Sequence, residues 1–209
     1  TEFFKHWILG AFIVLILVMS SSAFGKTRLL VLGDSLTAGY GLYADQTFPS
    51  RLEVTLRKVR VNNEVLNAGV SGDTTSGGLA RIDWVLQSKP THVILQHGAN
   101  DMLRGVSPAT AKKNITRIIE TLRHRKVQVL LAGMYASPNL GKIYGREFHE
   151  IYHQLASQFD LEFYPFFLAG VAAIPSLNLE DGLHPNAKGI QVIVNRILPT
   201  VLRFIRRVD

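Results

Sequence analysis

The stretch LLVLGDSLTAGYG, residues 29–41, is an apolar run that breaks into a glycine-punctuated turn carrying Asp34 and Ser35. Further apolar runs follow at 64–69, 92–98, 127–133 and 162–166. Stretches of helical pattern separate them, at 48–60, 75–88, 107–125 and 145–159. Continuous apolar strands that alternate with helices are typical of a parallel sheet covered on both faces. The sequence therefore predicts a single α/β domain built on such a sheet.

Polar residues and glycines are concentrated where the predicted strands end. The first strand ends in GDS, the second in NAGVSGD and the third in HGAND, and a loop after the last strand reads EDGLHP. In open parallel sheets the ligand lies in the crevice outside the carboxyl ends of the strands. We therefore expect these four segments to meet at one edge of the sheet.

The first turn holds either a phosphate or a nucleophile. It has no lysine for a Walker-type phosphate loop, and its glycines do not follow the G-x-G-x-x-G spacing of a dinucleotide site. A serine nucleophile needs a base that takes its proton and a third group that orients the base. Asp181 and His184, three residues apart in DGLHP, supply both. The sequence thus favours Ser35 as a nucleophile, with His184 as its base and Asp181 as the orienting group.

Attack by Ser35 would create an oxyanion, which requires fixed hydrogen-bond donors. Three donors are available near the strand ends: the backbone N–H of Ser35, the backbone N–H of Gly72 and the side-chain amide of Asn100. If each segment is considered alone, a structural role explains the residue as well as a catalytic one does. Gly72 would then be an ordinary turn glycine, and Asn100 would cap the end of a strand. Their joint placement favours an oxyanion hole.

The four blocks GDSLTAGYG, NAGVSGD, GAND and DGLHPN, in this order and spacing, resemble those of the GDSL, or SGNH, hydrolases. The resemblance covers nearly all of the chain after residue 25, and it is greatest to the bacterial periplasmic thioesterase I/lysophospholipase/arylesterase group. It implies a flavodoxin-like, three-layer α/β/α fold with a central parallel sheet of about five strands. It also implies ester or thioester hydrolysis through an acyl-enzyme, without a metal or other cofactor.

The same resemblance implies which residues contact the acyl chain. The stretch DMLRGV (101–106) corresponds to a mobile loop over the acyl chain, which makes Met102 and Leu103 candidate substrate contacts. The segment MYASPNLG (134–141) corresponds to the lining of the acyl pocket, with Pro138, Asn139 and Leu140 as candidates. This segment differs from the LPANYG usual in the group, so the preferred chain length stays open.

Three other functions compete with this interpretation. The sequence HEIYH (149–153) has the H-E-x-x-H pattern of zinc metalloproteases, in which two histidines on one helix face bind zinc and the glutamate acts as base. Its helix, however, presents the apolar stripe that contains Phe148 and Ile151 to the core, which leaves His149 and His153 on the flank. A carbohydrate O-deacetylase would use the same serine site. A non-catalytic lipid- or glycan-binding domain would use the fold alone.

The N-terminus indicates export. Lys5 and His6 precede an apolar stretch from Trp7 to Met19, and SSSAFGK then supplies small residues around a cleavage point after Ala23 or Gly25. This order is typical of a secretory signal peptide, and about 20 apolar residues would be needed to span a membrane. We therefore expect a signal peptide at 1–25, with an uncleaved anchor as the alternative, and one hydrolase domain at 26–209 in the periplasm or secreted.

Composition limits the partners. The chain has no cysteine, which excludes disulfides, a thiol nucleophile and thiolate metal sites. Its formal net charge is +7, but the basic clusters at 56–60, 123–126 and 203–207 have no interleaved aromatic residues and lie at predicted helix ends. We expect a monomer that acts on a small acyl ester or thioester, binds no nucleic acid, and makes at most weak, peripheral contact with membranes.

Overall fold

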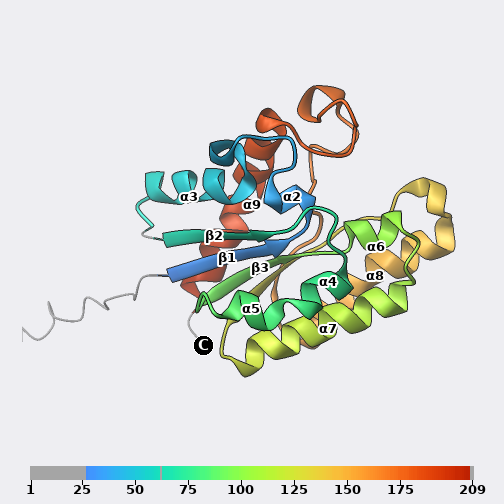
Figure 1. Ribbon diagram of the computed structural model, residues 1–209, viewed down its shortest axis with the longest axis horizontal. Coiled ribbons are helices and arrows are strands. Elements are labelled where there is room, and N and C mark those ends of the chain that lie inside the picture. The colour runs from blue at the N-terminus through green and yellow to red at the C-terminus, as the bar shows by residue number, and fades with distance from the viewer. Residues whose placement is uncertain (1–26, 62, 208–209) are drawn as a thin grey trace, which may run out of the picture.

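The computed structural model describes residues 27–61 and 63–207 and contains a five-stranded sheet. Figure 1 shows this sheet and labels its strands β1, β2 and β3. The strands are β1 (Thr27–Gly33), β2 (Asn63–Gly69), β3 (His92–Gln96), β4 (Gln128–Ala132) and β5 (Glu162–Tyr164). Their order is β2-β1-β3-β4-β5, and every neighbouring pair is parallel. This is the flavodoxin-like order, so the expected fold is confirmed.

Helices cover both faces of the sheet, which makes three layers (Figure 1). On one side lie α3 (Phe48–Lys58) and α9 (Ala187–Arg206), which pack against each other. On the other lie α4 (Thr75–Ala80), α5 (Ile82–Leu86), α7 (Pro108–His124) and α8 (Lys142–Gln158). Because both faces are covered, the central strands are apolar throughout, and the side chains of Leu29–Leu32 and Val93–Leu95 are all buried.

The boundaries of the helices follow local chemistry. The α7 helix begins as the sequence predicts, because the Ser107 hydroxyl accepts a hydrogen bond from the Thr110 N–H and Pro108 occupies the first turn. The stretch expected as one helix at 75–88 instead forms α4 and α5, which meet at Arg81. The Arg81 side chain turns toward the sheet, where it binds Asp73 and the carbonyl oxygens of Ala68 and Gly33.

The sheet order places the crevice for a ligand. β1 pairs with β2 on one side and β3 on the other, so the chain changes direction across the sheet between β1 and β3. A crevice opens at the carboxyl ends of the strands at such a point. Short helices leave these ends: α2 (Ser35–Ala38) follows β1, and α6 (Ala99–Leu103) follows β3. Three 3₁₀ helices, η1 (Ala44–Gln46), η2 (Pro138–Leu140) and η3 (Pro175–Leu177), lie in the loops.

The expected signal peptide at 1–25 lies outside the described residues. Among the helices that the structure describes, none is both long and apolar enough to cross a bilayer.

Candidate active site

Ser35 stands at the start of α2, where β1 ends. The side chain of Asp34 caps this helix, because its Oδ1 accepts a hydrogen bond of 3.0 Å from the Leu36 N–H. Ser35 is therefore the first helical residue, and it is 9% exposed at the bottom of the crevice. The cap directs the chain sharply from strand into helix and turns the hydroxyl toward the loop at 181–184.

Asp34 itself is fully buried. Burial is the main cause that raises the pKa of its carboxyl to about 6, while hydrogen bonds from the Leu36 N–H and the Gln96 amide lower it. The Gln96 Nε2 lies 3.4 Å from the Asp34 Oδ2. These contacts tie the turn to β3 and give Asp34 a structural role.

Ser35, His184 and Asp181 form a continuous hydrogen-bonded chain. The Ser35 Oγ lies 2.9 Å from the His184 Nε2, and the His184 Nδ1 lies 2.6 Å from the Asp181 Oδ2. The other oxygen of Asp181 accepts the backbone N–H groups of Leu183 at 2.8 Å and His184 at 3.0 Å. The backbone N–H of His184 is the largest cause that lowers the pKa of Asp181 to about 2. The carboxylate beside the imidazole is therefore ionised and held in one orientation.

Tyr40 covers the imidazole of His184, a contact that the sequence analysis missed. The two ring centroids are 4.4 Å apart and their planes are tilted by 34°. Tyr40 belongs to the quoted GDSLTAGYG block, so an aromatic residue shortly after the nucleophile was the available signal. The ring limits the positions that His184 can adopt.

Gly72 and Asn100 lie on separate segments that reach the same cavity. Gly72 occupies a turn after β2 with a φ of +80°, a conformation that glycine adopts without strain. Asn100 is the second residue of α6, and the residue before this helix, Gly98, has a φ of +117°. A side chain at Gly98 would collide with the Tyr152 hydroxyl, so glycine is required there.

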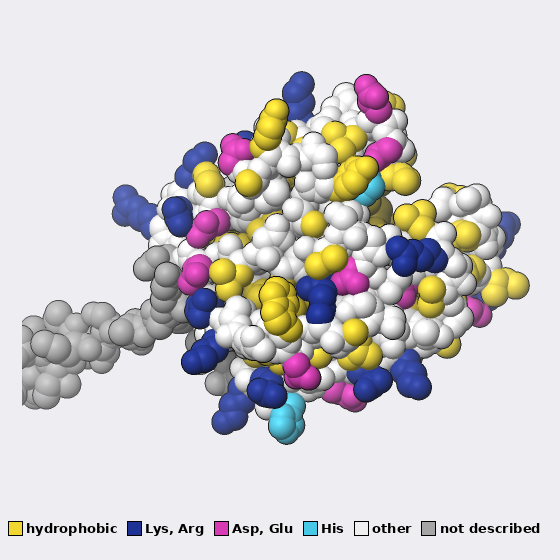
Figure 2. All heavy atoms as spheres, in the orientation of Figure 1, with side chains coloured by type: hydrophobic (Ala, Val, Ile, Leu, Met, Phe, Trp, Pro, Cys, Tyr) yellow, Lys and Arg dark blue, Asp and Glu magenta, His cyan; other side chains and the backbone are white. Residues whose placement is uncertain are grey.

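The cavity beside Ser35 has a volume of about 310 Å³ and mostly apolar walls. Its lining residues are Ser35, Leu36, Tyr40, Ser71, Gly72, Ala99, Asn100, Met102, Leu103, Met134, Leu168, Leu183 and His184. In the space-filling view, hydrophobic side chains gather around a hollow above α6 (Figure 2). The structure thus brings the proposed nucleophile, base and oxyanion donors to one apolar cavity.

Only some of the candidate substrate contacts lie in the wall of the cavity. Met102 and Leu103 line the cavity, together with Met134 and Leu168, which the sequence analysis did not select. Pro138, Asn139 and Leu140 form η2 and do not line it. The segment that contains η2 lies behind Met102 instead, since the Ser137 N–H lies 3.1 Å from the Met102 Sδ. A substrate contact for these three residues stays a prediction.

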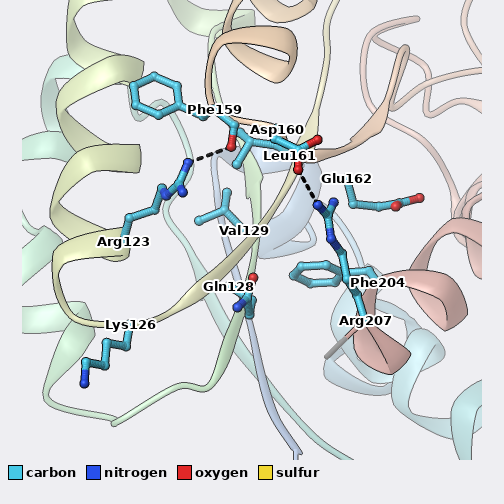
Figure 3. Close-up of a pocket in the computed structure, with 10 residues that line it drawn as sticks. All are labelled: Arg123, Lys126, Gln128, Val129, Phe159, Asp160, Leu161, Glu162, Phe204 and Arg207. Carbon is cyan, nitrogen blue, oxygen red and sulfur yellow. Dashed lines mark hydrogen bonds and ion pairs between the residues drawn. The ribbon is translucent and has the colours of Figure 1, made fainter. Parts of the chain in front are cut away.

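A larger cavity of about 460 Å³ lies elsewhere, beside the starts of β4 and β5 and the end of α9. Figure 3 shows that its cationic groups are engaged or turned away: Arg123 donates to the Phe159 carbonyl, Arg207 pairs with Asp160, and Lys126 extends outward. None of the residues that line it is a candidate for catalysis. The cavity beside Ser35 and His184 is therefore the candidate active site.

The H-E-x-x-H segment lies within α8, away from the Ser35 cavity. The His149 and His153 ring centroids are 4.6 Å apart, and the rings also contact Tyr135 and Phe163. Across residues 27–61 and 63–207, no three His, Cys, Asp or Glu side chains are grouped as a metal site would require. A catalytic zinc needs three protein ligands and an open position. The zinc alternative is not favoured.

Comparisons with known proteins show the family of the chain. Residues 31–192 match the model of the GDSL-like Lipase/Acylhydrolase family. The chain is 37% identical over 174 residues to an arylesterase of Vibrio mimicus, covering 83% of this chain and 87% of that one. It is 35% identical over 196 residues to thioesterase 1/protease 1/lysophospholipase L1 of Escherichia coli strain K12, covering 88% and 92%. Among solved structures, the SGNH-hydrolase family esterase AlinE4 is 46% identical with a TM-score of 0.73, covering 86% and 96%.

Proposed function

The chain belongs to the GDSL-like lipase/acylhydrolase family and is an ester-hydrolysing enzyme, and from this premise we propose that Ser35, His184 and Asp181 are its catalytic triad. The observation that carries the proposal is the unbroken chain of hydrogen bonds, 2.9 Å and then 2.6 Å long, from the Ser35 Oγ through His184 to Asp181. This is the geometry that allows a neutral serine hydroxyl to act as a nucleophile.

Acylation follows from these contacts. The Ser35 Oγ attacks the carbonyl carbon of the ester while its proton passes to the His184 Nε2, and Asp181 stabilises the imidazolium that forms. The tetrahedral intermediate collapses when His184 returns this proton to the leaving alcohol or thiol, which breaks the ester bond and leaves an acyl group on Ser35. Water then attacks the acyl carbonyl while its proton passes to His184, and His184 returns this proton to the Ser35 Oγ as the acyl–Oγ bond breaks, which releases the carboxylic acid and the free serine.

The oxyanion of each intermediate is held by three donors. They are the backbone N–H of Ser35, the backbone N–H of Gly72 and the side-chain amide of Asn100. The first N–H groups of a helix have no partner within it, so the Ser35 N–H at the start of α2 is available as a donor to the developing charge. Support for the other two comes from their presence in the wall of the same cavity as Ser35 and His184.

The substrate is a small acyl ester or thioester whose acyl chain lies against apolar side chains. Met102, Leu103, Met134 and Leu168 supply such a wall, which suits a hydrocarbon better than a sugar ring. This supports acyl hydrolysis over carbohydrate O-deacetylation at the same serine. The mechanism needs no cofactor, because acid, base and oxyanion donors all come from the chain.

We further propose that the enzyme is exported through residues 1–25 and works in the periplasm or outside the cell as a monomer, with at most weak membrane contact. On the face shown in Figure 2, Lys and Arg side chains are scattered among acidic ones and form no continuous patch. This supports the absence of a nucleic-acid partner. The export is tested by sequencing the N-terminus of the protein recovered from a bacterial periplasm, which should begin near Phe24 or Lys26. An intact 1–25 segment in the membrane fraction would support an anchor.

The triad is tested with Ser35→Ala. Because only one hydroxyl carries the chemistry, the variant should lose hydrolysis of p-nitrophenyl esters and labelling by a fluorophosphonate probe, with an unchanged circular dichroism spectrum. Labelling that persists in the variant would place the nucleophile elsewhere. Initial rates across p-nitrophenyl esters of increasing chain length would then define the acyl preference.

A further inference from the structure

The direction of the Gly72 N–H depends on a tight turn. The Asp73 N–H donates to the Val70 carbonyl at 3.1 Å, which closes a β-turn with Ser71 and Gly72 at its centre. Gly72 has a φ of +80°, and Ser71 is not among the described residues with positive φ. This combination defines a type II turn. The N–H of Gly72 takes no part in the hydrogen bond that closes such a turn, so it is available to an oxyanion.

The same turn has an alternative form that would remove this donor. Types I and II differ by a half rotation of the central peptide, which here joins Ser71 and Gly72. Glycine adopts either form, since positive and negative φ cost it about the same. Rotation to type I would turn the Gly72 N–H to the opposite side of the turn. The Gly72 carbonyl belongs to the next peptide, whose Asp73 N–H closes the turn in both forms, so a contact to this carbonyl fixes where the turn lies.

Arg104 makes such a contact. Its Nη2 donates to the Gly72 carbonyl oxygen at 2.7 Å, the only side-chain hydrogen bond to this residue among those found in the described chain. Arg104 follows directly after α6, the helix that carries Asn100, and its own N–H donates to the Asn100 carbonyl at 3.1 Å. One residue thus connects the two segments that supply oxyanion donors.

A buried contact also joins α6 to the start of α4, the helix that follows the turn. The Asp101 carboxylate accepts the Thr75 N–H at 2.8 Å and the Thr75 hydroxyl at 2.6 Å. Both residues are almost fully buried, and the Asn114 amide donates to the same hydroxyl at 3.0 Å. This contact sets the distance between α6 and the start of α4, and Arg104 then determines how the exposed turn between them lies.

We propose that Arg104 is a positioning residue that holds the Val70–Asp73 turn in place through the Gly72 carbonyl, so that the Gly72 N–H is directed to the oxyanion. The inference rests on the proposed oxyanion role of Gly72. Arg104 is exposed and does not line the cavity, so it acts through Gly72 and not by touching the substrate.

The test compares Arg104→Met and Arg104→Lys with a matched control, Arg123→Met. Arg123 is also an exposed arginine that donates to a backbone carbonyl, that of Phe159 at 2.6 Å, but it lies at the distant cavity. With p-nitrophenyl butyrate, Arg104→Met should lower kcat about 10- to 100-fold with KM within about threefold, below the 10²–10³-fold typical of losing a whole donor. Arg104→Lys should recover part of the loss, and Arg123→Met should stay within about twofold of the parent enzyme.

A double-mutant cycle separates this inference from the function on which it rests. In a Gly72→Ala background, where φ near +80° is already unfavourable, Arg104→Met should add little further loss; in an Asn100→Ala background the two losses should multiply. A fall in kcat for Gly72→Ala with none for Arg104→Met would overturn only the positioning role. Full kcat in Gly72→Ala would overturn the oxyanion role itself. Should Gly72→Ala not fold, a change in KM alone for Arg104→Met would refute the proposal.

Discussion

Replacing Asp181 by asparagine should inactivate the enzyme through the protonation of His184. One oxygen of Asp181 accepts two backbone N–H groups, at 2.8 and 3.0 Å. The asparagine oxygen must take this place, because the opposite orientation would set an NH₂ group against two N–H donors and lose both hydrogen bonds. Its NH₂ group then faces the His184 Nδ1, which becomes an acceptor. The proton moves to Nε2, where it blocks removal of the Ser35 proton.

The expected loss is about 10⁴-fold in kcat, the size found when the equivalent aspartate of another serine hydrolase is replaced by asparagine. It corresponds to about 5.5 kcal/mol of transition-state stabilisation. The assay is p-nitrophenyl butyrate hydrolysis at pH 7 to 8, with ¹⁵N spectra of the imidazole reporting which nitrogen carries the proton.

Glu180→Gln provides the matched control, because it removes the same charge from the neighbouring exposed residue. It should leave kcat within about twofold. If Asp181→Asn kept more than a tenth of the parent kcat, or if the imidazole carried its proton on Nδ1 in that variant, the tautomer argument would be wrong.

Three further predictions follow from single contacts. Asn100→Ala should lower kcat about 10²–10³-fold with KM changed only a few-fold, because its amide acts mainly on the oxyanion; unfolding at a much lower temperature with full kcat would make Asn100 a cap instead. The pKa of Asp34 is raised from 3.8 to about 6, so folding binds a proton between these values, and the stability present below pH 3.8 is lost as pH rises through 6. Asp34→Asn should remove this dependence, roughly 2 kcal/mol between pH 4 and 7 in urea unfolding, and equal slopes in both proteins would contradict it. EDTA, or His149→Ala, should leave esterase activity within about twofold, whereas loss on chelation with recovery on adding zinc would favour a metal-dependent reaction.

Much of the fold was predictable because it depends on periodic burial. The strands β1 and β3 are buried on both faces, so consecutive side chains along each strand must be apolar, and such a run can be recognised in the sequence. The start of α7 was predictable for a local reason, the Ser107 cap with Pro108 behind it. The break between α4 and α5 was not, because it accompanies contacts of Arg81 with β1 and β2, which lie far away in the sequence.

Some residues of the candidate site could likewise be predicted from the sequence, whereas their contacts with remote residues could not. Ser35, Asp181 and His184 could be selected from the sequence, since each lies in a short block whose residue types suit one reaction. The contacts of Tyr40 with His184 and of Arg104 with Gly72 could not, because they join side chains across 144 and 32 positions of the chain. Pro138, Asn139 and Leu140 were chosen by resemblance, and the structure puts their turn behind Met102, outside the wall of the cavity.

By itself, then, the sequence determined the alternation of strands and helices and the edge of the sheet where polar residues gather, and it supplied the proposed nucleophile, base and orienting carboxylate. Burial patterns and residue chemistry are properties of short segments, so they can be read without coordinates. Only the tertiary structure decided that the Ser35 Oγ lies 2.9 Å from an imidazole 149 residues away, which side chains wall the cavity, and which arginine holds the turn at Gly72. These depend on how separate segments pack against one another, because distances of a few ångströms between remote residues arise only when the whole core is assembled.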